Sequence, residues 1–246
     1  MPLSDYRTAL VTGASSGIGY AVTTALSGKG IEVYAVARRE NRLEQLSNET
    51  GCKIHVLDVR DTQRIYETFA DLKVDILINN AGHGRGFDAL FEVNPEDIDA
   101  SIDTNVRAAI HMLRAVLPGM VERKCGHVVN MGSMTGLYAL KTSVYGSSKG
   151  AVHMLSRNLR LELQGTGVKV TEICPGRVQS EFYDVAIDDP KLRTQIKESG
   201  IRELTPKDVA EAILYALDTP WHVNVNLIEL QPTEQTYGGS QFVPFK

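Results

Sequence analysis

Cysteine is scarce in this chain, and histidine does not occur in ligand-like patterns. The three cysteines, Cys52, Cys125 and Cys174, are far apart, and none forms a Cys-x-x-Cys pair. This spacing excludes a disulfide framework and offers no zinc motif. The six histidines show no ligand spacing either, so we expect no metal site. Unpaired cysteines, together with an N-terminal stretch that lacks the apolar run of a signal peptide, favour a cytoplasmic location.

Long apolar runs and blocks of like charge are also missing. Because no apolar stretch is long enough to span a bilayer, we expect no membrane partner. The formal net charge is -4 without a basic block, so we expect no nucleic-acid partner. No internal repeat and no linker rich in proline, glycine or serine divides the 246 residues. The whole chain, 1–246, is therefore predicted to form a single domain.

Short apolar runs alternate with helix-length segments along the chain. Buried strands are predicted at 8–12, 31–36, 53–57, 75–78, 127–131 and 168–173, with a further edge strand within 223–230. Helices are predicted at 17–28, 41–49, 61–70, 145–164 and from the cap Thr205-Pro206 onward, and 95–122 is expected to form two helices broken near Asn105. This order predicts an α/β fold with one Rossmann-type doubly wound parallel sheet of about seven strands, flanked by helices on both faces.

Residues 176–204 carry charges but no strong hydrophobic period. The stretch is long for a plain connection between a strand and a helix. We therefore expect it to be a substrate lid or binding loop; a short surface helix without a special role is the alternative.

A glycine-rich turn follows the first predicted strand. Its sequence, Thr12-Gly13-Ala14-Ser15-Ser16-Gly17-Ile18-Gly19, lies between that strand and a helix. Glycines in this position let the backbone approach a pyrophosphate, and the positive end of the helix faces the negative charge. The turn therefore predicts a dinucleotide cofactor, bound by Gly13, Ser15, Ser16, Gly17, Ile18 and Gly19.

The end of the second strand indicates which dinucleotide is bound. An acidic residue there would accept a hydrogen bond from the 2′-hydroxyl of NAD, but this chain has Ala37 followed by Arg38 and Arg39. Two guanidinium groups suit a 2′-phosphate, so we expect NADP(H) to be preferred over NAD(H), with Arg39 the less certain ligand. The alternative is that both arginines are solvated at the start of the next helix.

Further polar residues end the third and fourth strands, on the edge of the sheet where such folds bind ligands. Asp58 and Val59 end the third strand, and Asn80-Ala81-Gly82 ends the fourth. We expect Asp58 to accept a hydrogen bond from the adenine amino group; a helix-start cap is the alternative.

Tyr145 and Lys149 are four residues apart in a predicted helix, which places them on one face. A free tyrosine has a pKa near 10. A neighbouring ammonium stabilises the phenolate and lowers that pKa, so the pair is suited to proton transfer near neutral pH. Ser133, just before this region, is placed to donate a hydrogen bond to a carbonyl oxygen that develops charge.

Together these motifs resemble the short-chain dehydrogenase/reductase family over nearly the whole chain. The residues that carry the resemblance are the turn at 12–19, Asn79-Asn80-Ala81-Gly82, Asn105, Ser133, Tyr145 with Lys149, and Pro175-Gly176. The resemblance implies that Tyr145 is the general acid/base and that Ser133 orients the substrate carbonyl. It implies that Lys149 lowers the pKa of Tyr145 and holds the nicotinamide ribose, and that Asn105 supports a water-mediated proton relay.

The resemblance extends to the rest of the cofactor site. It implies that Asn80, Ala81 and Gly82 shape the adenosine side, and that Pro175, Gly176 and Val178 border the nicotinamide. Two departures from the family pattern stand out: Ser180 replaces a threonine that contacts the cofactor, and Ser16 stands where some NADP-dependent members have a basic residue. Phosphate recognition is therefore assigned mainly to Arg38.

Within the family, the tail Val223-Asn224-Val225-Asn226 and the pair Glu181-Phe182 resemble the branch that acts on serine, 3-hydroxy acids and sulfoacetaldehyde. Such small anionic substrates suggest Arg177 as a binding residue beside Ser133 and Tyr145, with Arg85 as a second candidate. The predicted reaction is hydride transfer between NADP(H) and a carbonyl or alcohol, in a homotetramer or homodimer. A 3-oxoacyl thioester reductase and a non-catalytic NADP-sensing regulator are the alternatives.

Overall fold

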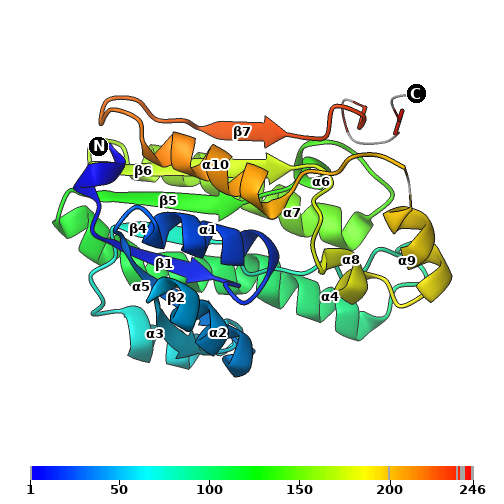
Figure 1. Ribbon diagram of the computed structural model, residues 1–246, viewed down its shortest axis with the longest axis horizontal. Coiled ribbons are helices and arrows are strands. Elements are labelled where there is room, and N and C mark those ends of the chain that lie inside the picture. The colour runs from blue at the N-terminus through cyan, green and yellow to red at the C-terminus, as the bar shows by residue number, and fades with distance from the viewer. Residues whose placement is uncertain (1, 199, 237, 239–241, 245–246) are drawn as a thin grey trace.

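Parallel strands form one sheet through the middle of the molecule (Figure 1). The computed structural model describes residues 2–198, 200–236, 238 and 242–244, and in these ranges the sheet has seven strands in the order β3-β2-β1-β4-β5-β6-β7. Their bounds are β1 (Thr8–Thr12), β2 (Glu32–Ala37), β3 (Lys53–Val56), β4 (Ile76–Asn79), β5 (Gly126–Met131), β6 (Val168–Pro175) and β7 (Leu227–Leu230). Every neighbouring pair is parallel, which confirms the predicted fold class.

The strand order reverses between β1 and β4. From β1 the chain winds outward through β2 and β3, and then returns to pair β4 with the other side of β1. In such sheets a crevice for ligands opens at the carboxyl ends of the strands where the order reverses. The same end of the sheet carries α6 (Met134–Leu137), α8 (Phe182–Ala186) and α9 (Pro190–Lys197) (Figure 1).

Helices cover both faces of the sheet. One face packs against α1 (Gly17–Ser27), α2 (Glu40–Thr50) and α10 (Pro206–Leu217). The other packs against α3 (Thr62–Phe69), α5 (Ala108–Glu122) and α7 (Ser143–Glu162). The predicted cap of α10 is confirmed: the Thr205 side chain accepts from the backbone N–H of Asp208, with Pro206 in the first turn. None of the helices in the described ranges has the length and apolar character needed to cross a bilayer.

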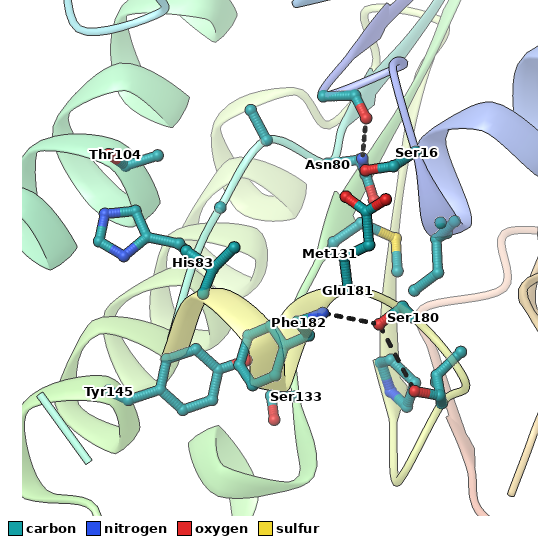
Figure 2. A pocket seen from close by; sticks show the side chains of 18 of the residues that line it. Ser16, Asn80, His83, Thr104, Met131, Ser133, Tyr145, Ser180, Glu181 and Phe182 are labelled. Atoms are coloured by element: carbon teal, nitrogen blue, oxygen red, sulfur yellow. Dashed lines mark hydrogen bonds between the residues drawn. The ribbon is translucent and has the colours of Figure 1, made fainter. Parts of the chain in front are cut away.

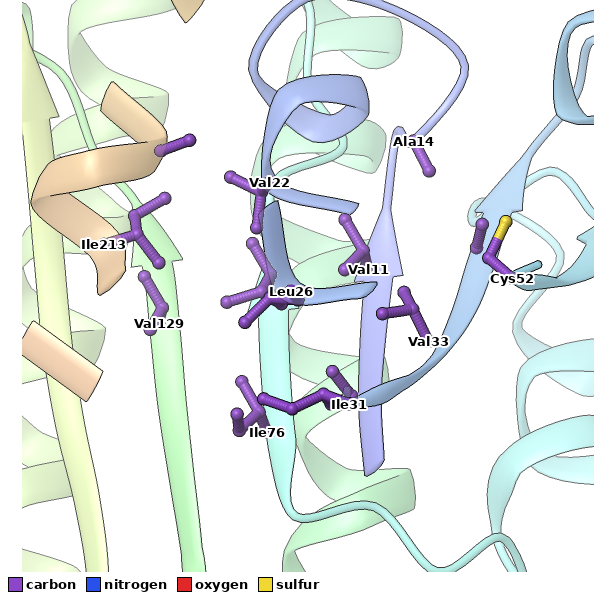
Figure 3. Packing of buried hydrophobic residues seen from close by; sticks show 14 of the residues in the cluster. Val11, Ala14, Val22, Leu26, Ile31, Val33, Cys52, Ile76, Val129 and Ile213 are labelled. Atoms are coloured by element: carbon purple, nitrogen blue, oxygen red, sulfur yellow. The ribbon is translucent and has the colours of Figure 1, made fainter. Parts of the chain in front are cut away.

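Burial on both faces explains why the strands read as continuous apolar runs. Successive side chains of a strand point to opposite faces. Val11 of β1 accordingly belongs to the same cluster as Leu26 of α1 and Ile213 of α10 (Figure 3), whereas its neighbour Leu10 joins the core on the far face. Leu10 and Val11 are both fully buried.

The stretch 95–122 differs from the expected pair of helices broken near Asn105. The chain stays helical from α4 (Pro95–Ile102) through a π-helical segment, Asp103–Arg107, into α5. A π turn accommodates one extra residue without ending the helix, and such turns are frequent at functional sites. The irregularity at Asn105 is therefore a bulge within one helical path.

Residues 176–204 contain the short helices α8 and α9 and return to their starting point. The backbone N–H of Gln179 donates to the carbonyl of Leu204 at 2.8 Å, and the N–H of Leu204 donates to the carbonyl of Arg177 at 3.1 Å. These two hydrogen bonds join the beginning and the end of the segment 176–204, which is called the excursion after β6 below. The Arg177 guanidinium adds an ion pair with Glu203.

Candidate active site

A cavity of about 470 Å³ opens at the carboxyl ends of the strands. Its wall includes the glycine-rich turn, the residues after β2, β3 and β4, and the excursion after β6. Gly19 and Asn105 lie behind this wall, and Arg85, the second candidate for anion binding, is not part of it. The other site residues predicted from sequence all lie on the wall: Gly13, Ser15, Ser16, Gly17, Ile18, Arg38, Arg39, Asp58, Val59, Asn80, Ala81, Gly82, Ser133, Tyr145, Lys149, Pro175, Gly176, Arg177 and Val178.

Hydrogen bonds from the end of β4 hold the glycine-rich turn in place. The Asn80 side-chain amide donates to the carbonyl of Thr12 at 2.9 Å, and the hydroxyl of Thr12 accepts from the backbone N–H groups of Asn80 and Ala81. Gly13 has a φ of +67°, and a Cβ on Gly19 would lie 2.3 Å from the carbonyl oxygen of Gly13. The turn therefore requires glycine at these positions, and the space left open at the start of α1 fits a pyrophosphate.

Arg39 connects this turn to the excursion after β6. Its guanidinium donates to the hydroxyls of Ser15 and Ser16, the latter at 2.6 Å. It also forms an ion pair with Glu181 at 2.7 Å, and Arg42 pairs with the other oxygen of the same carboxylate. Hydrogen bonds from both arginines lower the pKa of Glu181. Figure 2 shows the Glu181 carboxylate beside Ser16, across the cofactor end of the cavity.

Arg38 is positioned differently. Its side chain is 68% exposed, and its only ion pair among the described residues is a 3.9 Å contact with Asp58. Asp58 is held more closely by Arg60, at 2.6 Å, and that hydrogen bond lowers the pKa of Asp58. The helix-cap alternative for Asp58 is not what the structure shows, because Asp61 caps α3 by accepting from the N–H of Arg64.

At the other end of the cavity, Ser133, Tyr145 and Lys149 come together, each at most 8% exposed. Tyr145 and Lys149 share a face of α7, and Ser133 caps the helix α6 that follows β5. The hydroxyl oxygen of Ser133 accepts from the hydroxyl of Thr135 at 3.0 Å. Its own proton is thereby free to be donated, and a hydrogen bond from Ser133 stabilises the Tyr145 phenolate.

Asn105 lies behind this group and is 2% exposed. Its amide nitrogen donates to the carbonyl of His83 at 2.9 Å and to the hydroxyl of Ser148 at 3.0 Å. Its amide oxygen accepts from the backbone N–H of His83 at 3.0 Å. The π-helical residue thus links the loop after β4 to α7 and fixes the position of Gly82 next to Lys149.

Aromatic side chains enclose Tyr145. Phe87 stacks against the Tyr145 ring with centroids 5.3 Å apart, and Phe182 of α8 lies against it at 5.4 Å. Figure 2 shows Phe182 over Tyr145 and Ser133, with Glu181, the residue before it, directed toward the cofactor end. Two adjacent residues of the excursion therefore contact both ends of the cavity.

Burial opposes charge on both Tyr145 and Lys149. It raises the pKa of Tyr145 well above its usual range, and it lowers the pKa of Lys149 to about 8. Electrostatic interactions with the side chains of Cys174 and Glu172 act in the opposite direction on the pKa of Lys149. The Lys149 ammonium, which donates to the carbonyl of Met131 at 2.7 Å, therefore remains mostly charged at pH 7.

The two candidate anion-binding arginines both have partners. Arg177 is 5% exposed, pairs with Glu203, and stacks against Tyr183 and Phe242. Arg85 pairs with Asp188 of the excursion at 2.6 Å. Of the two, only Arg177 lines the cavity.

Several residues in and around the site could not be predicted from the sequence. Arg42, Phe87 and Tyr183 belong to no recognised motif, and the contact between Arg42 and Glu181 spans 139 positions. The one local signal is the spacing of Arg39 and Arg42, which places two cations on one side of a helix start.

A protein-family model and several known proteins match the sequence of this chain. Residues 7–190 match the family model described as short chain dehydrogenase. The chain is 40% identical over 239 residues to the NADP-dependent 3-hydroxy acid dehydrogenase YdfG of Escherichia coli (strain K12), covering 94% of this chain and 96% of the relative. It is 36% identical to sulfoacetaldehyde reductase 2 of Chromohalobacter salexigens, covering 93% and 95%.

Solved structures agree. The closed form of a serine dehydrogenase complexed with NADP+ superposes with a TM-score of 0.90 at 40% identity, covering 95% of this chain and 98% of that one. A serine dehydrogenase from Escherichia coli gives a TM-score of 0.81 at 39% identity, covering 94% and 100%. The family model covers most of the chain and these relatives cover nearly all of it, so the chain belongs to the short-chain dehydrogenase family.

Proposed function

We propose that this protein is an NADP-dependent oxidoreductase that interconverts a carbonyl compound and an alcohol, with Tyr145 as the general acid/base. The observation that carries the proposal is the cavity itself. Ser133, Tyr145 and Lys149 gather at one end, and a glycine-rich turn with two arginines lies at the other. Figure 2 shows Ser133 and Tyr145 at the first end and Ser16 at the second. The names of the relatives, which include a 3-hydroxy acid dehydrogenase and a sulfoacetaldehyde reductase, favour a small anionic substrate.

The residues present fit the cofactor. The turn residues that line the cavity, among them Gly13 and Gly17, would face the pyrophosphate, and Arg38 and Arg39 would hold the 2′-phosphate, since guanidinium groups match phosphate oxygens. The Lys149 ammonium would hold the ribose hydroxyls beside Tyr145. When bound, the cofactor supplies or accepts the hydride.

The chain itself performs the proton transfer. In reduction, the hydroxyl of Tyr145 gives its proton to the substrate oxygen, while Ser133 donates a hydrogen bond to the same oxygen. The positive charge of Lys149 then stabilises the phenolate left behind. Phe87 and Phe182 exclude water from the Tyr145 ring, which strengthens each of these interactions. In oxidation, the phenolate takes the proton from the alcohol.

Exposed apolar side chains on two helices also support the formation of an oligomer. A homodimer or homotetramer would cover apolar side chains that α5 and α7 leave exposed: Ile110 at 44%, Met154 at 50% and Leu161 at 73%.

Tyr145→Phe tests the proposal. The purified protein is assayed with NADP+ against L-serine, 3-hydroxybutanoate and 2-hydroxyethanesulfonate, with butan-2-ol as an uncharged comparison. Loss of general acid/base catalysis should lower kcat by about 10²–10⁴-fold. Tyr183→Phe is the matched control, because Tyr183 is a second tyrosine in the same cavity. Turnover that survives in Tyr145→Phe would contradict the mechanism, and NADPH binding without turnover on any compound would favour the regulator.

A further inference from the structure

A buried carboxylate lies among titratable groups next to the catalytic residues, yet outside the cavity wall. Glu172 of β6 has 0% of its surface exposed. One of its oxygens accepts from Nδ1 of His153 on α7 at 2.7 Å, and the other accepts from the thiol of Cys174 at 3.3 Å. The mechanism proposed above uses none of these three residues.

This cluster packs against the backbone that carries the site. A methyl group on Gly132 would lie 2.4 Å from a Glu172 oxygen and 2.6 Å from the Cys174 sulfur. Gly132 follows Met131, whose carbonyl accepts from Lys149, and it precedes Ser133, whose backbone N–H donates to the Cys174 sulfur. The carboxylate is thus separated from the catalytic groups by little more than one peptide.

Helix α7 brings Lys149 and His153 to the same side as this carboxylate. Tyr145, Lys149 and His153 follow one another at intervals of four residues and so share a helix face. His153 lies near the protein surface, where 22% of its side chain is exposed, whereas Lys149 is 6% exposed. A buried carboxylate is costly unless a cation or hydrogen bonds compensate for lost water, and the interaction between charges is strongest where water is excluded.

Charged or titratable groups that face the cluster come from three elements of the described chain. From α7 these are Tyr145, Lys149, His153 and Arg160; from β6, Cys174; and from β7, Glu229, which accepts from the hydroxyl of Tyr138 at 2.9 Å. Arg160 is partly exposed and donates to the carbonyl of Asn226. Lys149 is therefore the buried cation of this set.

We propose that Glu172 is a positioning residue, whose carboxylate is the counter-charge that keeps the Lys149 ammonium charged inside the protein while His153 holds that carboxylate in place. The inference rests on the proposed function, since Lys149 matters only if Tyr145 is the acid/base. It agrees with the electrostatics: burial lowers the pKa of Lys149, and the side chains of Cys174 and Glu172 oppose this change. Because burial raises the pKa of the Cys174 thiol, the carboxylate is the charged member of these two.

The sign of the effect follows from the protonation states. In carbonyl reduction, Tyr145 must start protonated and Lys149 charged, so the rate falls as pH rises through the pKa values of this coupled pair. Removing the nearby negative charge favours the deprotonated forms and moves that fall to lower pH. A shift of one pKa unit reduces the charged fraction about tenfold on the alkaline side.

Glu172→Gln is the test, because it keeps the shape and removes the charge. NADPH-dependent reduction of acetoacetate is followed from about pH 6 to about pH 10, and kcat/KM is plotted against pH. We expect the alkaline fall to begin about one pH unit lower than in the wild type, with little change at pH 6. Glu172→Asp keeps the charge and should restore the profile.

A matched control separates this effect from general loss of a buried carboxylate. Asp75 is 4% exposed and lies at the opposite end of the sheet, where it accepts from the backbone N–H groups of Arg7 and Thr8. Asp75→Asn should leave the pH at which kcat/KM falls unchanged. A folded Glu172→Gln protein with the wild-type pH profile overturns the proposal.

Two further measurements cover the remaining outcomes. If Glu172→Gln does not fold, His153→Arg replaces it at a partly exposed position; an arginine there would pair with Glu172, and an unchanged alkaline fall would again overturn the proposal. If acetoacetate is not turned over, NADPH affinity is titrated against pH by nicotinamide fluorescence, since Lys149 would hold the ribose. Failure of the proposed function shows separately, as undiminished turnover in Tyr145→Phe.

Discussion

Replacing Arg39 with methionine should weaken the binding of NADPH much more than that of NADH. The sequence assigns the 2′-phosphate mainly to Arg38, but the structure places the Arg39 guanidinium closer to the glycine-rich turn. It contacts the hydroxyls of Ser15 and Ser16, whereas the Arg38 side chain is 68% exposed and 3.9 Å from its nearest carboxylate. A phosphate at this turn would meet a guanidinium that is already held in position.

The expected magnitude follows from the exposure of Arg39. A hydrogen bond to a charged group contributes about 1.5–3 kcal/mol. Because 41% of the Arg39 side chain is exposed, solvent screening reduces this to about 1–2 kcal/mol. The NADPH/NADH affinity ratio should therefore fall about 5–30-fold in Arg39→Met. Removing both Arg38 and Arg39 should abolish the preference.

The assay is fluorescence titration of the purified protein with each reduced cofactor. Arg42→Met is the matched control: it removes the other cation that holds Glu181 but leaves Arg38 and Arg39 in place. It should change the two affinities equally. An unchanged affinity ratio in both Arg39→Met and Arg38→Met would refute the assignment of the 2′-phosphate to these arginines.

Two other substitutions probe the turn and the core. Gly19→Ala would place a methyl group 2.3 Å from the carbonyl oxygen of Gly13; we expect about 1–3 kcal/mol of lost stability in thermal unfolding and weaker binding of both cofactors. Gly28→Ala, at the right-handed end of the same helix, should do neither. Burial lowers the pKa of His127 to about 3, so the unfolded chain binds one more proton than the folded one between that pH and the ordinary value of 6.5. Stability should therefore decrease as the pH is lowered from about 6.5 to about 3, and in urea unfolding His127→Gln should reduce that slope by up to about 1.4 kcal/mol per pH unit; an unchanged slope would show that His127 is not the group responsible.

The strands and the principal cavity residues could be predicted because their signals are local. Both faces of the sheet are buried, so each central strand is a continuous apolar run, and the glycine-rich turn needs particular residues at fixed spacing. The final strand is shorter than predicted for a local reason. The side chain of Asn224 bonds to the backbone N–H and carbonyl of Val170, so regular pairing with β6 begins only at Leu227.

The rest depends on contacts between distant parts of the chain. The bridge from Arg39 to Glu181 spans 142 positions, and the cluster at Glu172 joins a strand to a helix that precedes it by 19 positions. No composition or period signals such pairs. The sequence locates an irregularity near Asn105 but does not show that it is a bulge, because one extra residue in a helix leaves the neighbouring residues helix-compatible.

That bulge has a consequence for insertions and deletions. A π turn takes up one extra residue, so the helices on either side of it keep the faces they would have in an uninterrupted helix one residue shorter. Deleting Val106 would therefore convert the π-helical segment into ordinary helix and leave the buried side chains of α5, such as Met112 and Leu113, facing the sheet. The loss would fall on Asn105, whose hydrogen bonds with His83 are made from the widened turn. The same deletion within α5 would instead rotate every following side chain by about 100° and turn its apolar face away from the sheet. A one-residue deletion should thus be better tolerated at the bulge than in the regular helix after it.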